Sequence, residues 1–201
     1  MNNSIMYHGG NRRLQDQFNS RRISDRLEEK LTHSQFTEGD KTIVESAAYF
    51  FLATADAEGR PDCSFKGGLP GFVRVVGPSE LAFPDYDGNG MFKSLGNILV
   101  NPNVGLLFIA MHGKPLRLRL NGTATVSDRD PLMAETVGAQ LIIRVIARAI
   151  FPNCPRYIPT MKLVEPSIYA PRSGHEAPEP AWKQFAEFKE HIHPRQPTFK
   201  G

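Results

Sequence analysis

The sequence has little of three things that would narrow its class quickly: cysteine, long apolar runs and charge of one sign. Only two of its 201 residues are cysteines, Cys63 and Cys154, and they lie far apart in the chain. They make no disulfide framework, and no Cys/His cluster shows the spacing of metal ligands. His191 and His193 stand in a proline-flanked tail, where we expect them to be solvated. The sequence therefore predicts neither a disulfide-stabilised domain nor a metal site.

The lack of long apolar runs bears on location. No apolar run approaches the length that spans a membrane, and residues 1–7 show no basic-then-apolar signal pattern. We therefore expect a cytoplasmic protein with no membrane partner.

The charge is nearly balanced, with 24 lysines and arginines against 21 aspartates and glutamates and a formal net charge of +3. No basic run is interleaved with aromatic residues, as a nucleic-acid surface would require. We expect no nucleic-acid partner. A pocket lined with a few cationic side chains, suited to an anionic ligand, fits this composition better.

Residues 11–31 show the spacing of short amphipathic helices. The phase of the pattern breaks near Asn19 and Ser20, so we predict two short helices, or a helix followed by an irregular arm. Helices packed on the outside of the folded core are the preferred interpretation, and an arm that reaches a second subunit is the alternative. The apolar side chains that recur four residues apart are Leu14 and Phe18, then Ile23, Leu27 and Leu31.

The middle of the chain is typical of an antiparallel β protein. Strand-length apolar runs are separated by short turns rather than by crossover helices. Leu141–Ile150 fits a helix or a strand, and we interpret it as a strand because an open barrel needs another partner there. Helices are expected at 37–48, from Asp130–Pro131 and at 180–191. The six strands predicted before residue 130 are 49–54, 62–66, 72–76, 80–83, 104–110 and 116–126.

A glycine-rich junction between the strand at 80–83 and a helix-like segment is the strongest candidate site. Glycine lets the backbone approach a ligand, and the start of a helix presents unpaired N–H groups to an anion. The spacing fits neither a Walker loop nor a dinucleotide fingerprint. A loop stabilised by Asp and Asn side-chain turns is the alternative. The donors that a phosphate would meet here are Asn89, Gly90, Lys93 and Ser94.

Two strands carry polar residues in alternation, which places them on one face of each strand. Asp62, Ser64 and Lys66 share a face, and a lysine followed by two glycines suits a phosphate or a polar ring edge. Arg117 and Arg119 share a face of a later strand, where an anionic partner would justify them. In both cases an ordinary solvated strand surface is the alternative, and the residues alone leave the choice open.

Several motifs together resemble the pyridoxamine 5'-phosphate oxidase-like family of FMN-binding split barrels. They are FFLATADAEGRPDCSFKGG, PGFVRVV, LAFPDYDGNGMFKSLGNILVNPNVGLLFI and RLRLNGTATV. The flanking YHGGNRRLQDQF and FPNCPRYIP are similar to a bacterial branch of general flavin-nucleotide-binding proteins. The resemblance implies a mainly β fold, a six-stranded antiparallel Greek-key split barrel with flanking helices, and a homodimer with FMN between its subunits. We accordingly expect an arm at 1–40, the barrel at 41–165 and a proline-rich tail at 166–201.

The resemblance also implies a set of cofactor-binding residues. Lys93 and Ser94 fall where the family holds the phosphate, although the family often has adjacent Arg and Lys there. Arg117 falls where a side chain of the partner subunit faces the flavin. The full set is Asp62, Ser64, Lys66, Pro84, Asp85, Asn89, Gly90, Lys93, Ser94, Asn97, Arg117 and Arg119.

Two departures from the family pattern limit the functional expectation. Leu69 follows the two glycines where that branch usually has an acidic residue, and the tail lacks the arginine-containing substrate motif of true pyridoxamine phosphate oxidases. We therefore expect an FMN-dependent oxidoreductase acting on a small organic substrate other than a B6 vitamer, with no catalytic residue assigned. The alternatives are a flavin carrier without turnover, or a barrel that binds a deazaflavin or haem.

Overall fold

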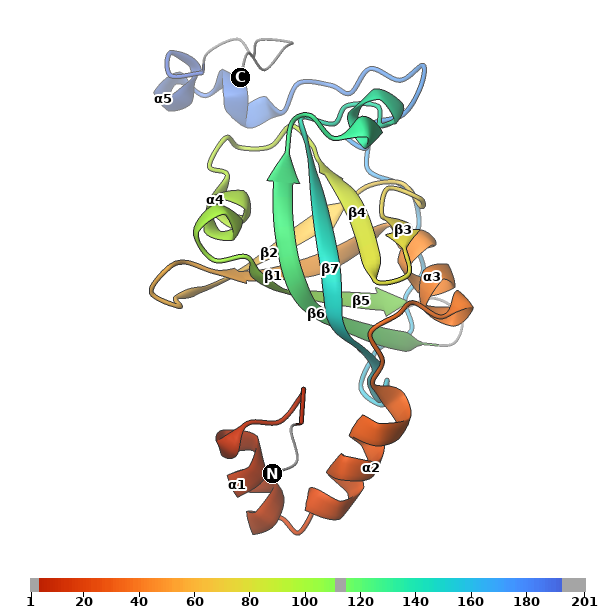
Figure 1. Ribbon diagram of the computed structural model, residues 1–201. Coiled ribbons are helices and arrows are strands. Elements are labelled where there is room, and N and C mark those ends of the chain that lie inside the picture. The colour runs from red at the N-terminus through yellow and green to blue at the C-terminus, as the bar shows by residue number, and fades with distance from the viewer. Residues whose placement is uncertain (1–3, 111–114, 193–201) are drawn as a thin grey trace.

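The computed structural model describes residues 4–110 and 115–192, and its centre is one antiparallel sheet (Figure 1). The strand order is β2-β1-β5-β6-β7-β4-β3, and every pairing is antiparallel. The sheet curls, but it does not close between β2 and β3, as in a split barrel. The strands are β1 Tyr49–Ala55, β2 Pro61–Gly67, β3 Arg74–Gly77, β4 Glu80–Asp85, β5 Asn103–Ala110, β6 Leu116–Ser127 and β7 Leu141–Pro152.

The described sheet has seven strands, one more than the six that the resemblance implies. The ambiguous segment Leu141–Ile150 is a strand, as interpreted, because it pairs with β6 on one side and β4 on the other. The third strand begins at Arg74, two residues later than predicted, because Phe72 and Val73 belong to the turn before it, where their side chains are buried. The short turn expected between the predicted strands at 104–110 and 116–126 lies almost wholly outside the described residues.

A cluster of phenylalanines holds the curled sheet together from inside. The ring of Phe50 lies 4.9 Å from that of Phe83 and 5.1 Å from that of Phe108, measured between centroids. These residues come from β1, β4 and β5, and all three are buried. Burial of such side chains stabilises the fold by about 1.5–3 kcal/mol each. The core therefore joins β1 and β4, the strands that lie next to the two edge strands of the sheet.

A bulge bends the long hairpin of β6 and β7. The pairing shifts from Asn121 opposite Ala149 to Gly122 opposite Ala147, which leaves Arg148 as the extra residue of β7. A Cβ atom at position 122 would lie 2.1 Å from the carbonyl oxygen of Ile146, so only glycine fits there. The bulge lets these strands curve around the core.

The helices lie at the periphery. The predicted helix at 37–48 is α3 Glu38–Glu45, where Thr37 and Asp40 form a capping box. The glycine-rich junction leads into α4 Lys93–Val100, and Asp130 caps the 3-10 helix η1 Pro131–Glu135. The predicted helix at 180–191 is wrong as one helix. Phe185 has extended backbone (φ −65, ψ 135) and divides it into η2 Ala181–Gln184 and α5 Ala186–Lys189.

The N-terminal segment forms two helices, the first of the two predicted alternatives: α1 Gly9–Gln17 and α2 Arg21–Leu31. The interpretation that they pack on the outside of the barrel is wrong, because the hairpin projects beyond one end of the sheet (Figure 1). No residue of α2 is buried. Periodicity identified the apolar face but not its partner. Within the described residues, no helix is both long and apolar enough to cross a membrane.

Candidate functional site

A polar groove of about 420 Å³ opens where β2 and β4 meet the loop that leads into α4. Its walls are β2, the end of β4 and most of the glycine-rich junction. The residues that line it are Asp62, Ser64, Phe65, Lys66, Asp85, Tyr86, Gly88, Asn89, Gly90, Met91, Phe92, Lys93, Ser94 and Leu95. Eight of the twelve residues predicted to bind a cofactor are therefore brought together, although their role as ligands stays a prediction.

The β2 wall follows from strand alternation. Asp62, Ser64 and Lys66 are half-buried, whereas Cys63 between them is exposed. Lys66 Nζ lies 3.9 Å from Asp85 Oδ1 at the end of β4, with both side chains largely covered. Opposite charges therefore face each other across one end of the groove.

The loop wall contains a tight turn whose glycine backbone is not covered by other atoms. Gly90 has φ +78, and a Cβ atom there would meet nothing within 4 Å. The Oδ1 atom of Asn89 accepts a hydrogen bond from the Met91 N–H at 3.0 Å. The side-chain turn that was the alternative to a phosphate site is thus present, and it occupies the carbonyl of Asn89 while it leaves the glycines open.

The start of α4 continues the loop wall of the groove. Its N-cap residue, Phe92, has a left-handed backbone (φ 47, ψ 29) and makes no side-chain capping hydrogen bond. The first N–H groups of a helix have no partner within the helix, and their partial positive charge attracts anions. Lys93 is exposed at this first turn and lines the groove. Non-glycine residues in the left-handed region concentrate at functional sites, which supports a role for this junction.

Ser94 is directed toward β2 rather than away from it. Its Oγ lies 2.9 Å from Ser64 Oγ and 3.3 Å from Asp62 Oδ2, and the residue is buried. These contacts fasten the helix start to the β2 wall. They also place a carboxylate beside the hydroxyl that the sequence suggested for a phosphate. Two lysines and two aspartates line the groove, so its field is not uniformly positive.

Four of the predicted site residues lie outside the groove lining. Pro84 is buried in β4, opposite Ile142, and Asn97 is buried where its Nδ2 donates to Thr54 Oγ1 at 3.0 Å. Arg117 and Arg119 stand on β6, which β5 and β1 separate from β2. Within one chain these arginines do not join the groove.

The side chains of Phe65, Tyr86, Met91 and Phe92 line the groove and were not singled out from the sequence. Burial raises the pKa of the Tyr86 hydroxyl, so it stays protonated and available as a donor at neutral pH. The only sequence signal for Tyr86 was its place inside the polar junction. The rings of Tyr86 and Phe92, which flank the loop glycines, offer apolar surface that a planar ligand would cover.

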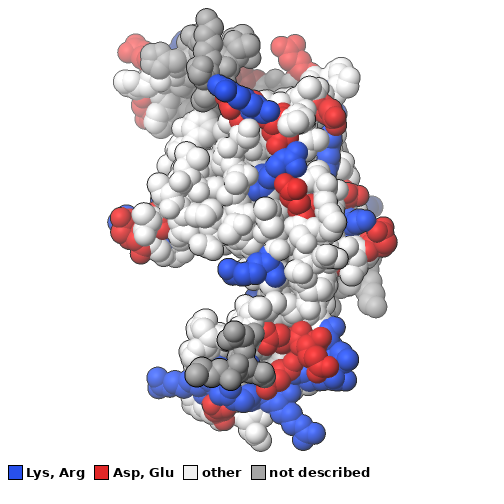
Figure 2. All heavy atoms as spheres, in the orientation of Figure 1, with Lys and Arg blue, Asp and Glu red and all other residues white. Residues whose placement is uncertain are grey.

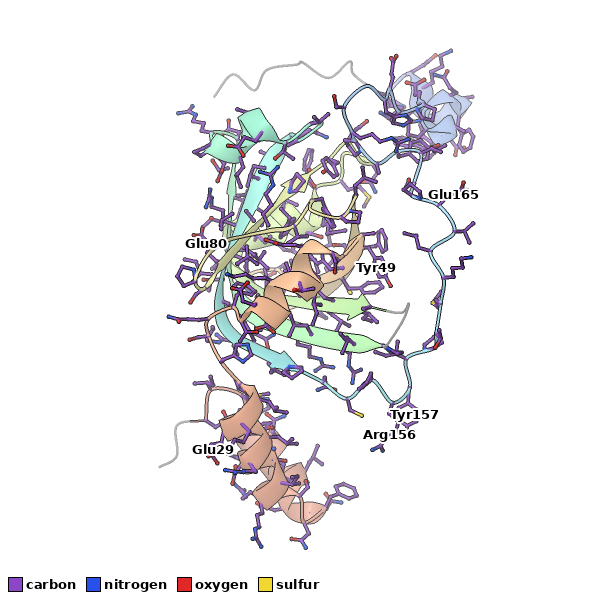
Figure 3. The ribbon with its side chains drawn as sticks, turned by 90° about the vertical axis from the view of Figure 1, so that its right-hand side faces the viewer. Glu29, Tyr49, Glu80, Arg156, Tyr157 and Glu165 are labelled. Atoms are coloured by element: carbon purple, nitrogen blue, oxygen red, sulfur yellow. The ribbon has the colours of Figure 1, made fainter. Side chains whose placement is uncertain are left out.

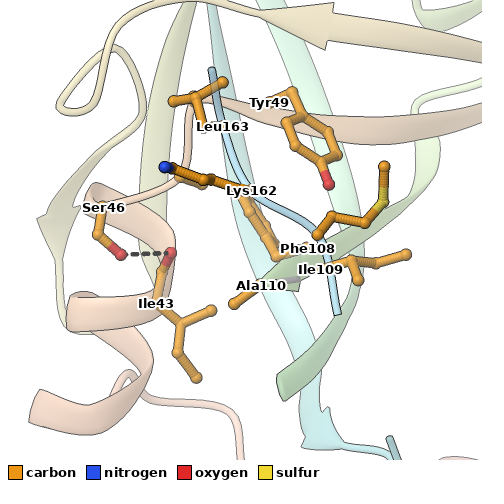
Figure 4. Close-up of a pocket in the computed structure, with 11 residues that line it drawn as sticks. Ile43, Ser46, Tyr49, Phe108, Ile109, Ala110, Lys162 and Leu163 are labelled. Atoms are coloured by element: carbon orange, nitrogen blue, oxygen red, sulfur yellow. Dashed lines mark hydrogen bonds between the residues drawn. The ribbon is translucent and has the colours of Figure 1, made fainter. Parts of the chain in front are cut away.

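A second, smaller cavity of about 150 Å³ lies between α3, β1, the end of β5 and the segment 161–163 (Figure 4). Its walls are mostly apolar, with Ile43, Tyr49 and Phe108 among them. Tyr49 also stacks on Phe65 at 5.4 Å between ring centroids. This stack joins the smaller cavity to the wall of the groove.

Charge is unevenly distributed on the visible surface. In Figure 2 the acidic and basic side chains gather on the N-terminal hairpin, whereas the barrel face over α4 and β6 carries few of them. Exposed Leu99 and Val100 of α4 belong to the apolar surface of the protein. Among the residues that the structure describes, no group of three His, Cys, Asp or Glu side chains is placed to hold a metal ion.

The fold and the groove define a class first: a split antiparallel barrel with a polar groove at a strand-to-helix junction. The sequence pattern of the family described as pyridoxamine 5'-phosphate oxidase matches residues 36–165, more than half of the chain. The protein belongs to this family. No match was found among curated proteins.

Several solved structures are similar to part of this chain. HupZ from Group A Streptococcus is 16% identical and has a TM-score of 0.47, with 63% of this chain and 99% of that chain covered. A candidate pyridoxamine 5'-phosphate oxidase from Lactobacillus delbrueckii is 22% identical, with a TM-score of 0.46 and coverage of 59% and 95%. The haem storage protein HutZ from Vibrio cholerae is 18% identical, with a TM-score of 0.43 and coverage of 59% and 95%.

Proposed function

We propose that this groove binds FMN and that the protein is an FMN-dependent oxidoreductase for a small organic substrate. The observation that carries the proposal is the uncapped start of α4, with Lys93 exposed beside it and the open backbone of Gly90 in front. A phosphate dianion requires several donors that converge from one side. The helix N–H groups and the Lys93 ammonium supply them in this groove.

The remaining groove residues would orient the rest of the cofactor. Lys66 stands at the other end of the β2 face, where a cation stabilises negative charge on a bound ring. The aromatic rings of Phe65 and Tyr86 offer apolar contact. When bound, FMN would supply the hydride or electron transfer, and the chain supplies binding, orientation and charge.

We further propose a homodimer with the flavin between its subunits. Arg117 and Arg119 lie outside the groove of their own chain, so they would face a flavin only from a partner. Arg117 is held in place, because its guanidinium donates to Asn153 Oδ1 and to the carbonyl oxygen of Cys154 at 2.7 Å. The family resemblance implies a homodimer, and the weakly charged barrel face in Figure 2 suits such a contact.

The alternatives within this proposal are a flavin carrier without turnover and a barrel for a deazaflavin or haem. The described groove lining has neither histidine nor cysteine, the commonest axial ligands of haem iron, which favours a flavin. The tail lacks the substrate motif of true pyridoxamine phosphate oxidases, which favours another substrate. Two free cysteines fit a reducing compartment, so the cytoplasm is the proposed location.

The deciding experiment is a fluorescence titration of the flavin-free protein with FMN, riboflavin and FAD. We expect tight binding of FMN and weak binding of riboflavin, because riboflavin lacks the phosphate. Reduction of the bound flavin by a nicotinamide cofactor, followed by reoxidation by an added acceptor, would distinguish an oxidoreductase from a carrier. Equal affinity for FMN and riboflavin would contradict the phosphate site.

Substitution at the start of α4 tests the same assignment. Lys93→Ala should weaken FMN binding by about 1–3 kcal/mol, the free energy of a charged hydrogen bond, and riboflavin binding should change little. Ser94→Ala should weaken it less, because the Ser94 hydroxyl already lies against Ser64 and Asp62. Lys41→Ala, a lysine of α3 outside the groove, is the matched control.

A further inference from the structure

The C-terminal tail returns to the groove from the far end of the barrel. After β7 the chain runs from Arg156 and Tyr157 at one end to Glu165 and the tail at the other (Figure 3). There the short helices η2 and α5 lie beyond the junction of β4 and α4 (Figure 1). The tail therefore lies close to the loop that forms one wall of the groove, although the two are far apart in the sequence.

An ion pair joins the tail to this loop. Lys183 Nζ of η2 lies 2.9 Å from Asp87 Oδ2, and the two residues are 96 positions apart. The Lys183 side chain is only 15% exposed, whereas that of Asp87 is 48% exposed. A lysine on a short surface helix is ordinarily solvated. Its burial here shows that the side chain is laid against the protein and directed at the loop.

The residue before Asp87, Tyr86, lies near a second segment that packs against the tail. A Cβ atom on Gly138 would lie 2.7 Å from Pro171 Cβ of the tail and 3.9 Å from Tyr86 Cδ1. Gly138 therefore packs against Pro171 of the tail and lies near Tyr86, and its φ of +78 is one that glycine adopts readily. Just before Tyr86, the Asp85 carbonyl accepts a hydrogen bond from the Gln140 N–H at 2.9 Å. Asp85 and Asp87 thus have bonded partners outside the groove, and Tyr86 between them lies near Gly138.

These supports act on residues that line the groove. Tyr86 and Gly88 flank Asp87, and both belong to the lining. The loop beyond them contains Gly88 and Gly90, which by themselves restrict the backbone little. An exposed ion pair contributes little to global stability. A pair that fixes one end of a glycine-rich loop acts instead on the fraction of molecules in which the loop has its binding conformation.

We propose that Lys183 is a positioning residue for the cofactor: together with the packing of Pro171 against Gly138 beside Tyr86, it braces the β4–α4 loop in the conformation that forms the phosphate end of the groove. The proposal rests on the proposed function for its cofactor. The bracing itself is a property of the free protein. Lys183 touches the loop rather than the ligand, so its loss affects ligand binding through the loop.

The test compares the full-length protein with Lys183→Met, Lys183→Arg and Lys189→Met. Hydrogen exchange of the amides of residues 86–91 is measured in the flavin-free proteins, and FMN and riboflavin are then titrated. Lys183→Met should speed exchange in this loop and weaken FMN binding roughly three- to tenfold, because fewer molecules hold the loop ready. Lys183→Arg keeps the charge, so its loop exchange and its FMN affinity should be close to those of the wild type. Lys189→Met loses the same charge from α5 and should resemble the wild type.

A second variant removes the pair from the other side. Asp87→Asn should also speed exchange in this loop, because it removes the same ion pair from the other side. Unchanged loop exchange and FMN affinity in Lys183→Met would overturn the proposal, as would faster exchange with unchanged FMN affinity. Absence of FMN preference in the wild type overturns the proposed function instead, and the exchange comparison still decides whether the tail braces the loop.

Discussion

Asp62 places a negative charge beside the helix start that we propose for the phosphate. Its carboxylate lies 3.3 Å from Ser94 Oγ, next to the helix start where we place the phosphate. Two negative charges near each other repel by about 1 kcal/mol in a solvated groove. Asp62→Asn keeps the shape and removes this repulsion. We therefore expect FMN binding to tighten by about 0.5–1 kcal/mol, with no gain for riboflavin, in parallel fluorescence titrations.

Glu58→Gln is the matched control for Asp62→Asn, because it removes one negative charge from the exposed turn between β1 and β2. It should leave both affinities unchanged. If Asp62→Asn weakened FMN and riboflavin equally, Asp62 would be an acceptor for the ribityl hydroxyls, and the phosphate would have to lie farther from it than we propose.

At the scale of single elements, β7 is fastened to η1 by a partly buried charge cluster. Asp130 caps η1 by accepting from the Leu132 N–H at 2.9 Å, and its side chain is 5% exposed. The guanidinium of Arg144 donates to both carboxylate oxygens of Asp130 and lies 3.2 Å from Glu80. The hydrogen bonds from Arg144 lower the pKa of Asp130, and the same contacts raise the pKa of Arg144.

This cluster predicts how stability depends on pH. Because the pKa of Asp130 is lower in the folded than in the unfolded protein, its stabilisation is present above the unfolded value of about 4. It is lost as the pH falls from there through the folded pKa. Asp130→Asn should lower the free energy of unfolding by about 2 kcal/mol at pH 7 and flatten its decline below pH about 4, as followed by urea denaturation. Glu135→Gln, which breaks the exposed pair with Arg74, should cost less than about 1 kcal/mol. Equal effects of the two substitutions would contradict the role of the buried cluster.

The strands and helices around the groove show what a sequence can and cannot predict. Strand alternation has a period of two, so it predicted that Asp62, Ser64 and Lys66 would share a face. The Ser94–Asp62 and Lys183–Asp87 contacts join residues 32 and 96 positions apart, and no local pattern signals them. The sequence analysis also missed the break at Phe185. The helical spacing of the apolar residues continues across it, so nothing in the local pattern indicates the extended backbone there.

For the whole molecule, the unexplained feature is the N-terminal hairpin. It is well ordered within itself, because Arg12 pairs with Asp25 at 2.6 Å and Arg21 pairs with Asp16 at 2.5 Å. It nevertheless leaves apolar side chains in solvent instead of burying them on the barrel. The exposed set is Leu14, Phe18, Ile23, Leu27 and Leu31. Such a surface costs solubility unless something covers it, and the proposed homodimer offers a second copy of the chain for that purpose.

Substitution of this surface tests both the dimer and its link to the flavin. Ile23→Ser/Leu27→Ser should shift the protein from dimer to monomer in sedimentation equilibrium, and the monomer should not retain FMN if Arg117 of a second chain completes the site. The melting temperature of the barrel should hold, because no residue of α2 is buried in the single chain. Arg22→Ser, an exposed polar position on the same helix, is the control and should leave the dimer intact. A monomeric variant that still binds FMN as tightly as the wild type would show that one chain builds the whole site, and Arg117 and Arg119 would then have no part in it.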